Sequence, residues 1–303
     1  EVLNACIARC GIRHVLTSRR VMERLDLKID AELVFLEDFR AKVTVADKLL
    51  SLASAQLEPV WSLQRRLGLA KIEPDDLLTI IFTSGSTGMP KGVMLTFGNI
   101  GSNIDSIQRV LNLRRDDVLL GILPFFHSFG YTATLWTMLT LEPKAVYHYS
   151  PLEARQVGNL CREHGVTILV GSPTFLRSYT RRCEPEEFAT LDVVVAGSEK
   201  LPKEVSDGFE QKFGVRPVEG YGTTELSPVV SVNIPPSRAV TPGDTGVKEG
   251  TIGRTLPGIR AKVVDLETGE DIGEDKSGML LISGPNVMKG YLDEPEKTAE
   301  VLR

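Results

Sequence analysis

Hydroxyl side chains, glycines and one lysine gather in residues 83–92, and this combination suits the binding of a polyphosphate. The segment reads Thr-Ser-Gly-Ser-Thr-Gly-Met-Pro-Lys-Gly and follows the apolar run 77–82. Glycines let the backbone approach an anion, hydroxyls donate hydrogen bonds to phosphate oxygens, and Lys91 supplies a positive charge. Counted from Gly85, Pro90 stands where a Walker loop requires its second glycine, so a kinase-type P-loop is disfavoured. The alternative is a Ser/Gly loop that binds no ligand.

Two further segments place different chemistry after predicted strands. Residues 219–225 read Glu-Gly-Tyr-Gly-Thr-Thr-Glu and combine a ring for stacking on a base, hydroxyls for a phosphate and a carboxylate for Mg²⁺. Residues 124–130 read Pro-Phe-Phe-His-Ser-Phe-Gly and form an aromatic wall with one imidazole, His127. The alternatives are an ordinary strand exit with a capping glutamate and a histidine that is satisfied within the core.

The elements that must position these segments follow from the hydrophobic pattern. Apolar runs alternate with amphipathic stretches over most of the chain, which indicates an α/β fold with a mainly parallel sheet covered by helices. Several predicted strands are continuous apolar runs, as expected for strands buried on both faces. The predicted strands are 14–17, 33–36, 77–83, 118–123, 145–149, 167–170, 193–196, 217–221, 260–264 and 279–282, and the predicted helices are 2–10, 45–55, 99–111, 153–164 and 203–213.

A change of pattern divides the chain into three parts. After about residue 233, prolines and glycines interrupt any helix, and short strands with polar turns follow. We therefore expect a partial N-terminal α/β subdomain at residues 1–75, an α/β subdomain carrying the three segments at residues 76–235, and a β-rich subdomain at residues 236–303.

Composition and charge exclude several classes of protein. The 303 residues are 42% hydrophobic and 25% charged, which is typical of a folded globular chain, and the net charge of -5 argues against a nucleic-acid partner. The longest mostly apolar stretch, 131–141, is far shorter than the roughly 20 residues that cross a bilayer, so no transmembrane segment is expected. The four cysteines show neither a disulfide framework nor paired zinc spacing, which indicates reduced thiols and a cytoplasmic protein.

In order and spacing, the three segments together resemble the ATP-dependent adenylate-forming (AMP-binding) family: acyl-CoA synthetases, acyl-carrier-protein synthetases, luciferases and the adenylation domains of peptide synthetases. Residues 81–92 resemble the phosphate loop of the family, and residues 221–225 resemble its Tyr-Gly-x-Thr-Glu motif. Weaker resemblances lie at 171–174 (substrate-pocket turn), 197–199 (adenine-side loop), 250–258 (entry to the β-rich subdomain) and 283–291 (the segment before the ribose-binding motif). The resemblance covers most of the chain from Asp75 onward.

The resemblance implies that a carboxylic acid reacts with ATP to give an acyl adenylate and pyrophosphate, and that the acyl group then passes to a thiol. Charge neutralisation is the main requirement, because an anionic carboxylate must approach an anionic phosphate. Tyr221 would stack on adenine, Thr224 would contact the α-phosphate, and Glu225 would bind Mg²⁺. The implied catalytic residues are Lys91, His127 (bordering the acyl pocket), Thr224 and Glu225. The implied nucleotide-binding residues are Thr83, Ser84, Gly85, Ser86, Thr87, Gly88, Lys91, Gly197, Ser198, Glu199, Gly220, Tyr221, Gly222, Thr223 and Thr224.

A fatty acid is the expected substrate. Adenylation domains of peptide synthetases typically place an Asp in the aromatic segment to pair with the substrate ammonium, and residues 124–130 contain none. The apolar residues 131–141 and 175–176 favour an aliphatic acyl chain, the alternative being that 131–141 is a buried helix. Residues 16–23 and 35–38 look more like bacterial fatty-acyl-carrier-protein synthetase and 2-acylglycerophosphoethanolamine acyltransferase fusions than like acetyl-CoA synthetases.

The sequence also departs from the family pattern. In the family, a ribose-binding Asp, a hinge and a C-terminal lid with a catalytic Lys follow the Gly-Tyr segment, whereas this sequence ends first. We therefore expect the core of a larger enzyme, impaired in catalysis as this chain alone. CoA or acyl carrier protein is the expected thiol acceptor, and the full protein is expected in the cytoplasm or at the cytoplasmic face of the membrane. Adenylation of an aryl or other non-amino carboxylate and a non-catalytic nucleotide-binding homologue are the alternatives.

Overall fold

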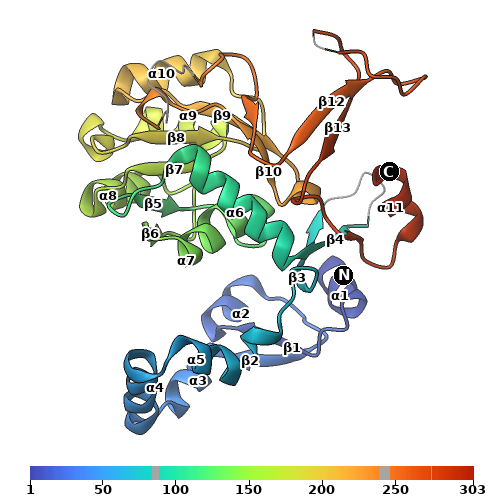
Figure 1. The fold of residues 1–303 in the computed structure, drawn as a ribbon. Helices are drawn as coiled ribbons and strands as arrows, with labels where there is room; N and C mark the ends of the chain where they lie inside the picture. The colour runs from blue at the N-terminus through green and yellow to red at the C-terminus, as the bar shows by residue number, and fades with distance from the viewer. Residues whose placement is uncertain (84–88, 239–245, 274) are drawn as a thin grey trace. The chain divides into compact units, whose positions relative to one another are not determined.

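A computed structural model describes residues 1–83, 89–238, 246–273 and 275–303 (Figure 1). The first unit comprises Glu1–Asp76, Phe82–Gly92 and Tyr291–Arg303, and the second unit comprises Leu77–Ile81 and Val93–Gly290. The division of the chain at residues 75 and 235 stays a prediction. The α/β class is confirmed, because each unit contains parallel strands connected through helices.

The second unit is built on a seven-stranded sheet in the order β11-β10-β9-β8-β7-β5-β6. Neighbours from β6 to β9 run parallel, whereas β10 and β11 are antiparallel to the strands beside them. The strands are β5 (Val118–Gly121), β6 (Lys144–Tyr147), β7 (Ile168–Gly171), β8 (Val193–Ala196), β9 (Val218–Gly222), β10 (Val229–Val232) and β11 (Arg254–Thr255).

Helices cover both faces of this sheet, which explains why its central strands are apolar throughout. Side chains alternate between two core clusters, so that Leu120 packs with the helices of one face and Leu119 with those of the other. The first cluster includes side chains from α8 (Ala154–His164), α9 (Pro173–Arg182), η3 (Pro185–Phe188) and α10 (Lys203–Phe213). The second includes side chains from α6 (Phe97–Leu111) and α7 (Thr137–Thr140), the latter continuing the π-helix η2 (Gly130–Trp136).

A buried ion pair fastens the short helix η5 (Pro236–Arg238) to the same sheet. The Arg238 side chain is 1% exposed and donates both terminal nitrogens to the carboxylate of Asp117, at 2.8 and 2.6 Å, and its Nε to Asp192 at 2.8 Å. Burial alone would raise the pKa of Asp117, but hydrogen bonds from Arg238, the Arg114 amide and the Thr167 hydroxyl outweigh it and lower the pKa. The pair joins the start of β5 to a segment far along the chain.

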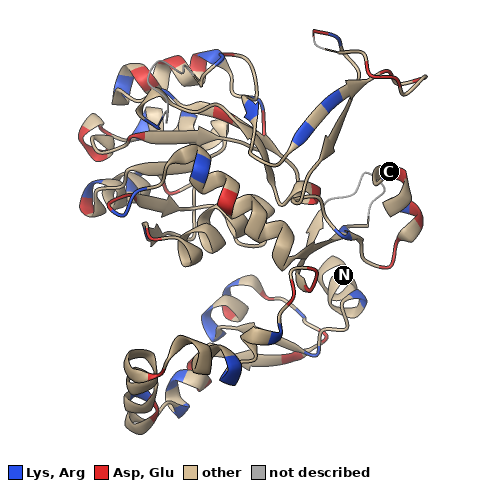
Figure 2. Ribbon diagram, viewed as in Figure 1, with Lys and Arg blue, Asp and Glu red and all other residues tan. Residues whose placement is uncertain are grey.

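The remainder of the second unit contains an antiparallel pair, β12 (Arg260–Val264) with β13 (Met279–Ser283), and the short helix η4 (Thr224–Leu226). Both strands of the pair lie in the region predicted to be rich in β-structure. Figure 2 shows basic and acidic residues interspersed over the helices of this unit.

The first unit contains a two-stranded parallel sheet and several short helices. β1 (His14–Thr17) pairs with β2 (Glu32–Phe35), with His14 opposite Glu32. A capping box between Thr44 and Asp47 starts the longest of its helices, because each side chain accepts a hydrogen bond from the other's backbone amide. The helices are α1 (Val2–Arg9), α2 (Arg19–Leu25), α3 (Leu36–Lys42), α4 (Val45–Leu57), α5 (Val60–Arg66), η1 (Leu69–Lys71) and α11 (Pro295–Val301).

Another sheet has the order β14-β4-β3. These strands are β3 (Leu77–Thr83), β4 (Lys91–Thr96) and β14 (Gly290–Tyr291). Within the first unit, the Leu292 amide donates to the Gly92 carbonyl at 2.8 Å. Of the described helices, none is both long and apolar enough to cross a membrane.

Candidate nucleotide and acyl site

The predicted segments of the second unit lie where parallel strands end. Residues 124–130 follow β5, residues 172–174 follow β7, residues 197–199 follow β8 and residues 223–225 follow β9. Carboxyl ends of parallel strands meet at one edge of a sheet, and ligands of open α/β sheets bind at that edge where the strand order reverses. Here it reverses at β5, because β6 lies on one side of it and β7 on the other.

Hydrogen bonds close the turn that carries His127. The His127 amide donates to the Pro124 carbonyl at 3.1 Å, and the Phe129 amide donates to Nδ1 of His127 at 3.3 Å. Gly130 is required here, because a Cβ at this position would lie 2.2 Å from the Pro124 carbonyl oxygen. His127 is accessible to solvent, but partial desolvation of its ring lowers its pKa, so the ring is neutral at pH 7. Nδ1 accepts a hydrogen bond, which leaves the proton of the neutral ring on Nε2.

Thr224 contacts this turn directly. Its Oγ1 lies 3.1 Å from Oγ of Ser128, the residue after His127, and the two hydroxyls share a hydrogen bond. Ser128 is 1% exposed, so the contact is set inside the protein and not at its surface. The structure therefore brings together two of the three segments on which the resemblance rests.

The turn around Glu225 is fixed by its backbone. The Glu225 carbonyl accepts a hydrogen bond from the Met288 amide at 2.8 Å, and the Thr223 amide donates to the Pro228 carbonyl at 3.0 Å. Gly222 leaves room for that carbonyl, since a Cβ there would lie 1.8 Å from its oxygen. The half-buried ring of Tyr221 packs against the second core cluster. These contacts hold the backbone from which both Thr224 and Glu225 extend.

Residues 197–199 lie against the other strand-end segments. The Gly197 amide donates to the Gly171 carbonyl at 3.0 Å, and the ring of Phe129 covers Gly197 so closely that a Cβ would lie 2.8 Å from it. The carboxylate of Glu199 accepts the Thr174 hydroxyl at 2.8 Å. Glu199, predicted to bind the nucleotide, therefore also joins the adenine-side loop to the substrate-pocket turn. Ser198 has a φ of 72°, a left-handed conformation that non-glycine residues adopt rarely.

The phosphate-loop residues are described in part. Thr83 ends β3 and Lys91 begins β4, and both belong to the first unit. The predicted loop residues between them, Ser84, Gly85, Ser86, Thr87 and Gly88, lie outside the described residues. The ammonium of Lys91 lies 4.9 Å from the centroid of the Tyr291 ring, within range of a cation–π interaction. Gly220 lies in the interior of β9.

The structure places the apolar residues that were predicted to favour an aliphatic acyl chain. Residues 131–141 form a π-helix that continues into α7, in which Thr132 and Met138 are buried and Leu139 is 67% exposed, and a role in the acyl pocket stays a prediction. Leu176 is fully buried in the first core cluster, and Phe175 packs against the same cluster. Met138, Leu176 and Phe175 therefore contribute to the core, and the preference for an aliphatic acyl chain stays a prediction.

The sequence patterns assigned no role to three residues near the predicted site. Ser128, Arg9 and Tyr291 contact or flank predicted site residues, yet each is separated from its contact by many positions in the sequence.

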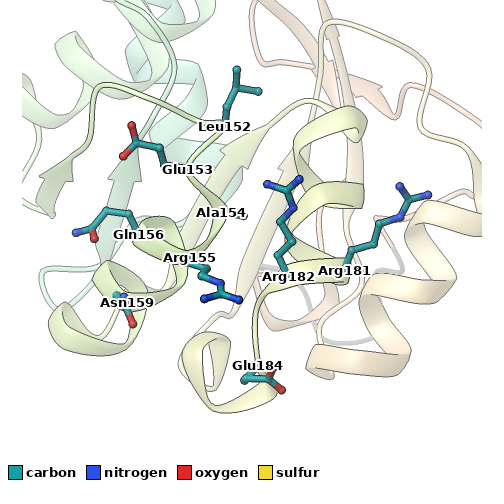
Figure 3. Close-up of a pocket in the computed structure, with 9 residues that line it drawn as sticks. All are labelled: Leu152, Glu153, Ala154, Arg155, Gln156, Asn159, Arg181, Arg182 and Glu184. Atoms are coloured by element: carbon teal, nitrogen blue, oxygen red, sulfur yellow. The ribbon is translucent and has the colours of Figure 1, made fainter.

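A hollow of about 770 Å³ lies beside α8 and α9, but no predicted site residue lines it (Figure 3). Within the described ranges, no group of three or more His, Cys, Asp or Glu residues is placed to hold a metal ion.

Comparisons with known proteins identify a family and several relatives. A family model described as AMP-binding enzyme matches residues 1–292. The long-chain-fatty-acid–CoA ligase of Bacillus subtilis (strain 168) is 34% identical over 244 residues, which cover 78% of this chain and 42% of that protein. The 4-coumarate–CoA ligase of Pinus taeda is 30% identical over 239 residues, which cover 77% of this chain and 44% of that protein.

Solved structures show the same fold. ATP-bound MatB from Rhodopseudomonas palustris has a TM-score of 0.78 and 26% sequence identity, and the match covers 99% of this chain and 56% of MatB. The chain spans less than half the length of the curated relatives that it matches.

Proposed function

Because the chain belongs to the AMP-binding enzyme family, we propose that the protein activates a carboxylic acid with ATP and transfers the acyl group to the thiol of CoA. In the first step a carboxylate oxygen attacks the α-phosphorus of ATP, the bond to the β-phosphate bridging oxygen breaks, and pyrophosphate leaves. In the second step the thiol sulfur attacks the acyl carbon, its proton is lost, and AMP leaves. CoA ligases among the relatives support this reaction.

The observation that carries the proposal is the hydrogen bond between Ser128 and Thr224. It sets the turn of His127 beside the strand exit of Glu225, at the sheet edge where α/β proteins bind ligands. His127 would border the reacting carboxylate as a neutral ring, so it would add no positive charge there. It need not accept a proton, because a carboxylic acid of ordinary pKa is already ionised at pH 7.

The roles of the remaining residues follow from charge. Lys91 would neutralise the β- and γ-phosphates together with the hydroxyls and amides of residues 83–88, and Thr224 would contact the α-phosphate. Mg²⁺ is bound in many enzymes by one or two carboxylates and the substrate phosphates, and Glu225 fits that donor set as a single carboxylate. When bound, the ion would neutralise phosphate charge; the residues of this chain would orient the nucleotide and the acid.

Two substrate classes have support. A fatty acid is supported by the 34% identity to a long-chain-fatty-acid–CoA ligase. An aryl acid is supported by several 4-coumarate–CoA ligases at about 30% identity. Residues 124–130 carry no Asp to pair with an ammonium, which argues against amino acids. Acyl carrier protein is the alternative thiol acceptor to CoA. The thioester product distinguishes the two acceptors.

The test is acid-dependent exchange of labelled pyrophosphate into ATP with saturated fatty acids of several lengths, 4-coumarate, benzoate and phenylalanine, followed by thioester formation with CoA and with acyl carrier protein. Exchange with a fatty or aryl acid, and none with phenylalanine, is expected. Exchange with none of these acids, while ATP still binds, would leave the non-catalytic homologue as the answer.

Lys91→Ala tests the assignment of the phosphate site. We expect a loss of about 100-fold in exchange, the scale on which one charged or hydrogen-bonding group stabilises a transition state. Lys144→Ala is the matched control, because Lys144 is an exposed lysine at the start of β6, at the opposite end of a strand from the site. An equal effect of both substitutions, or none of either, would reject the assignment.

A further inference from the structure

Arg9, at the end of α1, is hydrogen bonded to the residue that precedes Lys91. Its Nη1 donates to the Pro90 carbonyl at 2.9 Å, across 81 positions of sequence. Its guanidinium carbon also lies 5.8 Å from the centroid of the Phe82 ring, on the strand that leads into the phosphate loop. All of these residues belong to the first unit. One side chain therefore contacts the Phe82 ring on one side of residues 83–89 and the Pro90 backbone on the other.

The same guanidinium holds a second segment. Its Nη2 donates to the Leu292 carbonyl at 2.8 Å and to Oε1 of Glu294 at 2.7 Å. Glu294 is also paired with Lys297, and hydrogen bonds from Lys297 and then from Arg9 lower its pKa, so it is ionised at neutral pH. The side chains of Arg9 and Glu294 are 25% and 15% exposed, so this pair is partly withdrawn from solvent.

The two carbonyls that accept hydrogen bonds from Arg9 belong to residues next to Lys91 and Tyr291, and these two residues contact each other. Pro90 precedes Lys91 and Leu292 follows Tyr291, while the Lys91 ammonium lies over the Tyr291 ring, which is 4% exposed. The planar guanidinium of Arg9 thus fixes the backbone beside Lys91 and the backbone beside Tyr291. Arginine suits this position because its planar guanidinium can serve several acceptors at set angles, which an ammonium cannot.

We propose that Arg9 is a positioning residue that holds Lys91 where the nucleotide phosphates bind. This inference rests on the proposed function and adds a residue to it that lies far from the phosphate loop in sequence. Arg9 acts through the Pro90 backbone and does not itself contact the nucleotide. Its removal would allow the backbone before Lys91 to shift, and small displacements of a binding group are costly for reactions that depend on alignment.

The main test uses Arg9→Ala in the complete enzyme, with steady-state exchange kinetics. We expect the KM for MgATP to rise about tenfold, with the KM for the acid changed by less than about twofold. Arg9→Lys keeps the charge but loses the planar guanidinium, so it should restore part of the ATP affinity. A loss of stability with an unchanged KM for MgATP would overturn the proposal, because a structural contact alone would lower only the active fraction.

Arg13→Ala is the matched control. Arg13 follows the same helix and is exposed, and its side chain makes no hydrogen bond or ion pair within the described part of the chain. Its KM for MgATP should stay within about twofold of the wild-type value. A rise like that of Arg9→Ala would indicate a general effect of positive charge and would overturn the positioning role.

A double-mutant cycle separates this proposal from the proposed function. If Arg9 acts through Lys91, the double variant should bind MgATP no more weakly than Lys91→Ala alone, in calorimetry. Additive losses would overturn the positioning role while leaving the function intact. Normal MgATP binding by Lys91→Ala would instead reject the phosphate site itself.

Discussion

Within residues 1–76, all of which the structure describes, Ile7 is the one apolar side chain that is buried, and Trp61 and Leu57 are 68% and 82% exposed. The second unit instead contains two apolar clusters that cover both faces of its sheet. Burial of a large apolar side chain contributes roughly 1.5–3 kcal/mol, so the second unit has the larger source of stability.

This difference determines how each unit positions its candidate residues. In the second unit the strands are held by packing, and His127, Thr224 and Glu199 extend from segments that follow strands of the seven-stranded sheet. In the first unit Lys91 depends on polar contacts, among them the hydrogen bonds of Arg9. Substitutions in the core of the second unit should therefore change global stability, whereas polar substitutions in the first should act locally.

The largest expected effect is from Asp117→Ala in the second unit. The substitution leaves Arg238 buried without its main partner, and breaking a buried ion pair from one side costs about 3–5 kcal/mol in the free energy of unfolding. Urea unfolding measures this cost. Asp116→Ala, at the exposed neighbouring carboxylate, should cost less than about 0.5 kcal/mol. Similar losses in the free energy of unfolding for both variants would show that the burial of Asp117 does not determine the effect.

Gly197→Ala should have an intermediate effect. The added Cβ would lie 2.8 Å from the Phe129 ring, and such overpacking costs about 1–3 kcal/mol. Because Phe129 belongs to the His127 turn, acid-dependent exchange should fall as well. In Gly208→Ala, within α10, the nearest atom to the new Cβ is 4.0 Å away, and this control should be neutral or stabilising by up to about 1 kcal/mol. If Gly208→Ala proves less stable to unfolding than Gly197→Ala, the close contact between Gly197 and the Phe129 ring is refuted.

The smallest effect concerns Glu58 in the first unit. Hydrogen bonds from Arg66, Ser54 and Ser62 lower its pKa from 4.5 to about 2. A lowered pKa stabilises the folded state above the ordinary value, and the contribution is lost as pH falls from about 4.5 towards 2. Glu58→Gln should remove this step from the acid titration of helix content, measured by circular dichroism. The effect should be small because the Arg66 side chain of the pair is 54% exposed, so solvent screens the interaction.

Glu73→Gln is the control for the acid titration. Glu73 is exposed, and its carboxylate makes no hydrogen bond or ion pair among residues that the structure describes. Its titration curve should match that of the wild type. If Glu58→Gln also leaves the curve unchanged, the polar contacts between α4 and α5 do not hold this part of the first unit.

Much of the secondary structure could be predicted because its signal is local. The strands at 77–83, 193–196 and 260–264 and the helix at 203–213 have the predicted bounds, since apolar runs and amphipathic periods are contained within each element. The pattern did not predict α9, whose short, largely polar sequence begins at a proline. It also did not predict β14, a strand of two residues that pairing with a distant segment creates.

The sequence by itself determined the three segments and the family, because hydroxyls, glycines and a lysine at short spacing are local features that any conformation of the chain retains. Only the tertiary structure decided that Ser128 contacts Thr224, that Glu199 bonds Thr174 and that Arg9 reaches Pro90. These partners are separated by 96, 25 and 81 positions, and such contacts depend on how strands and helices pack, which no short stretch of residues specifies.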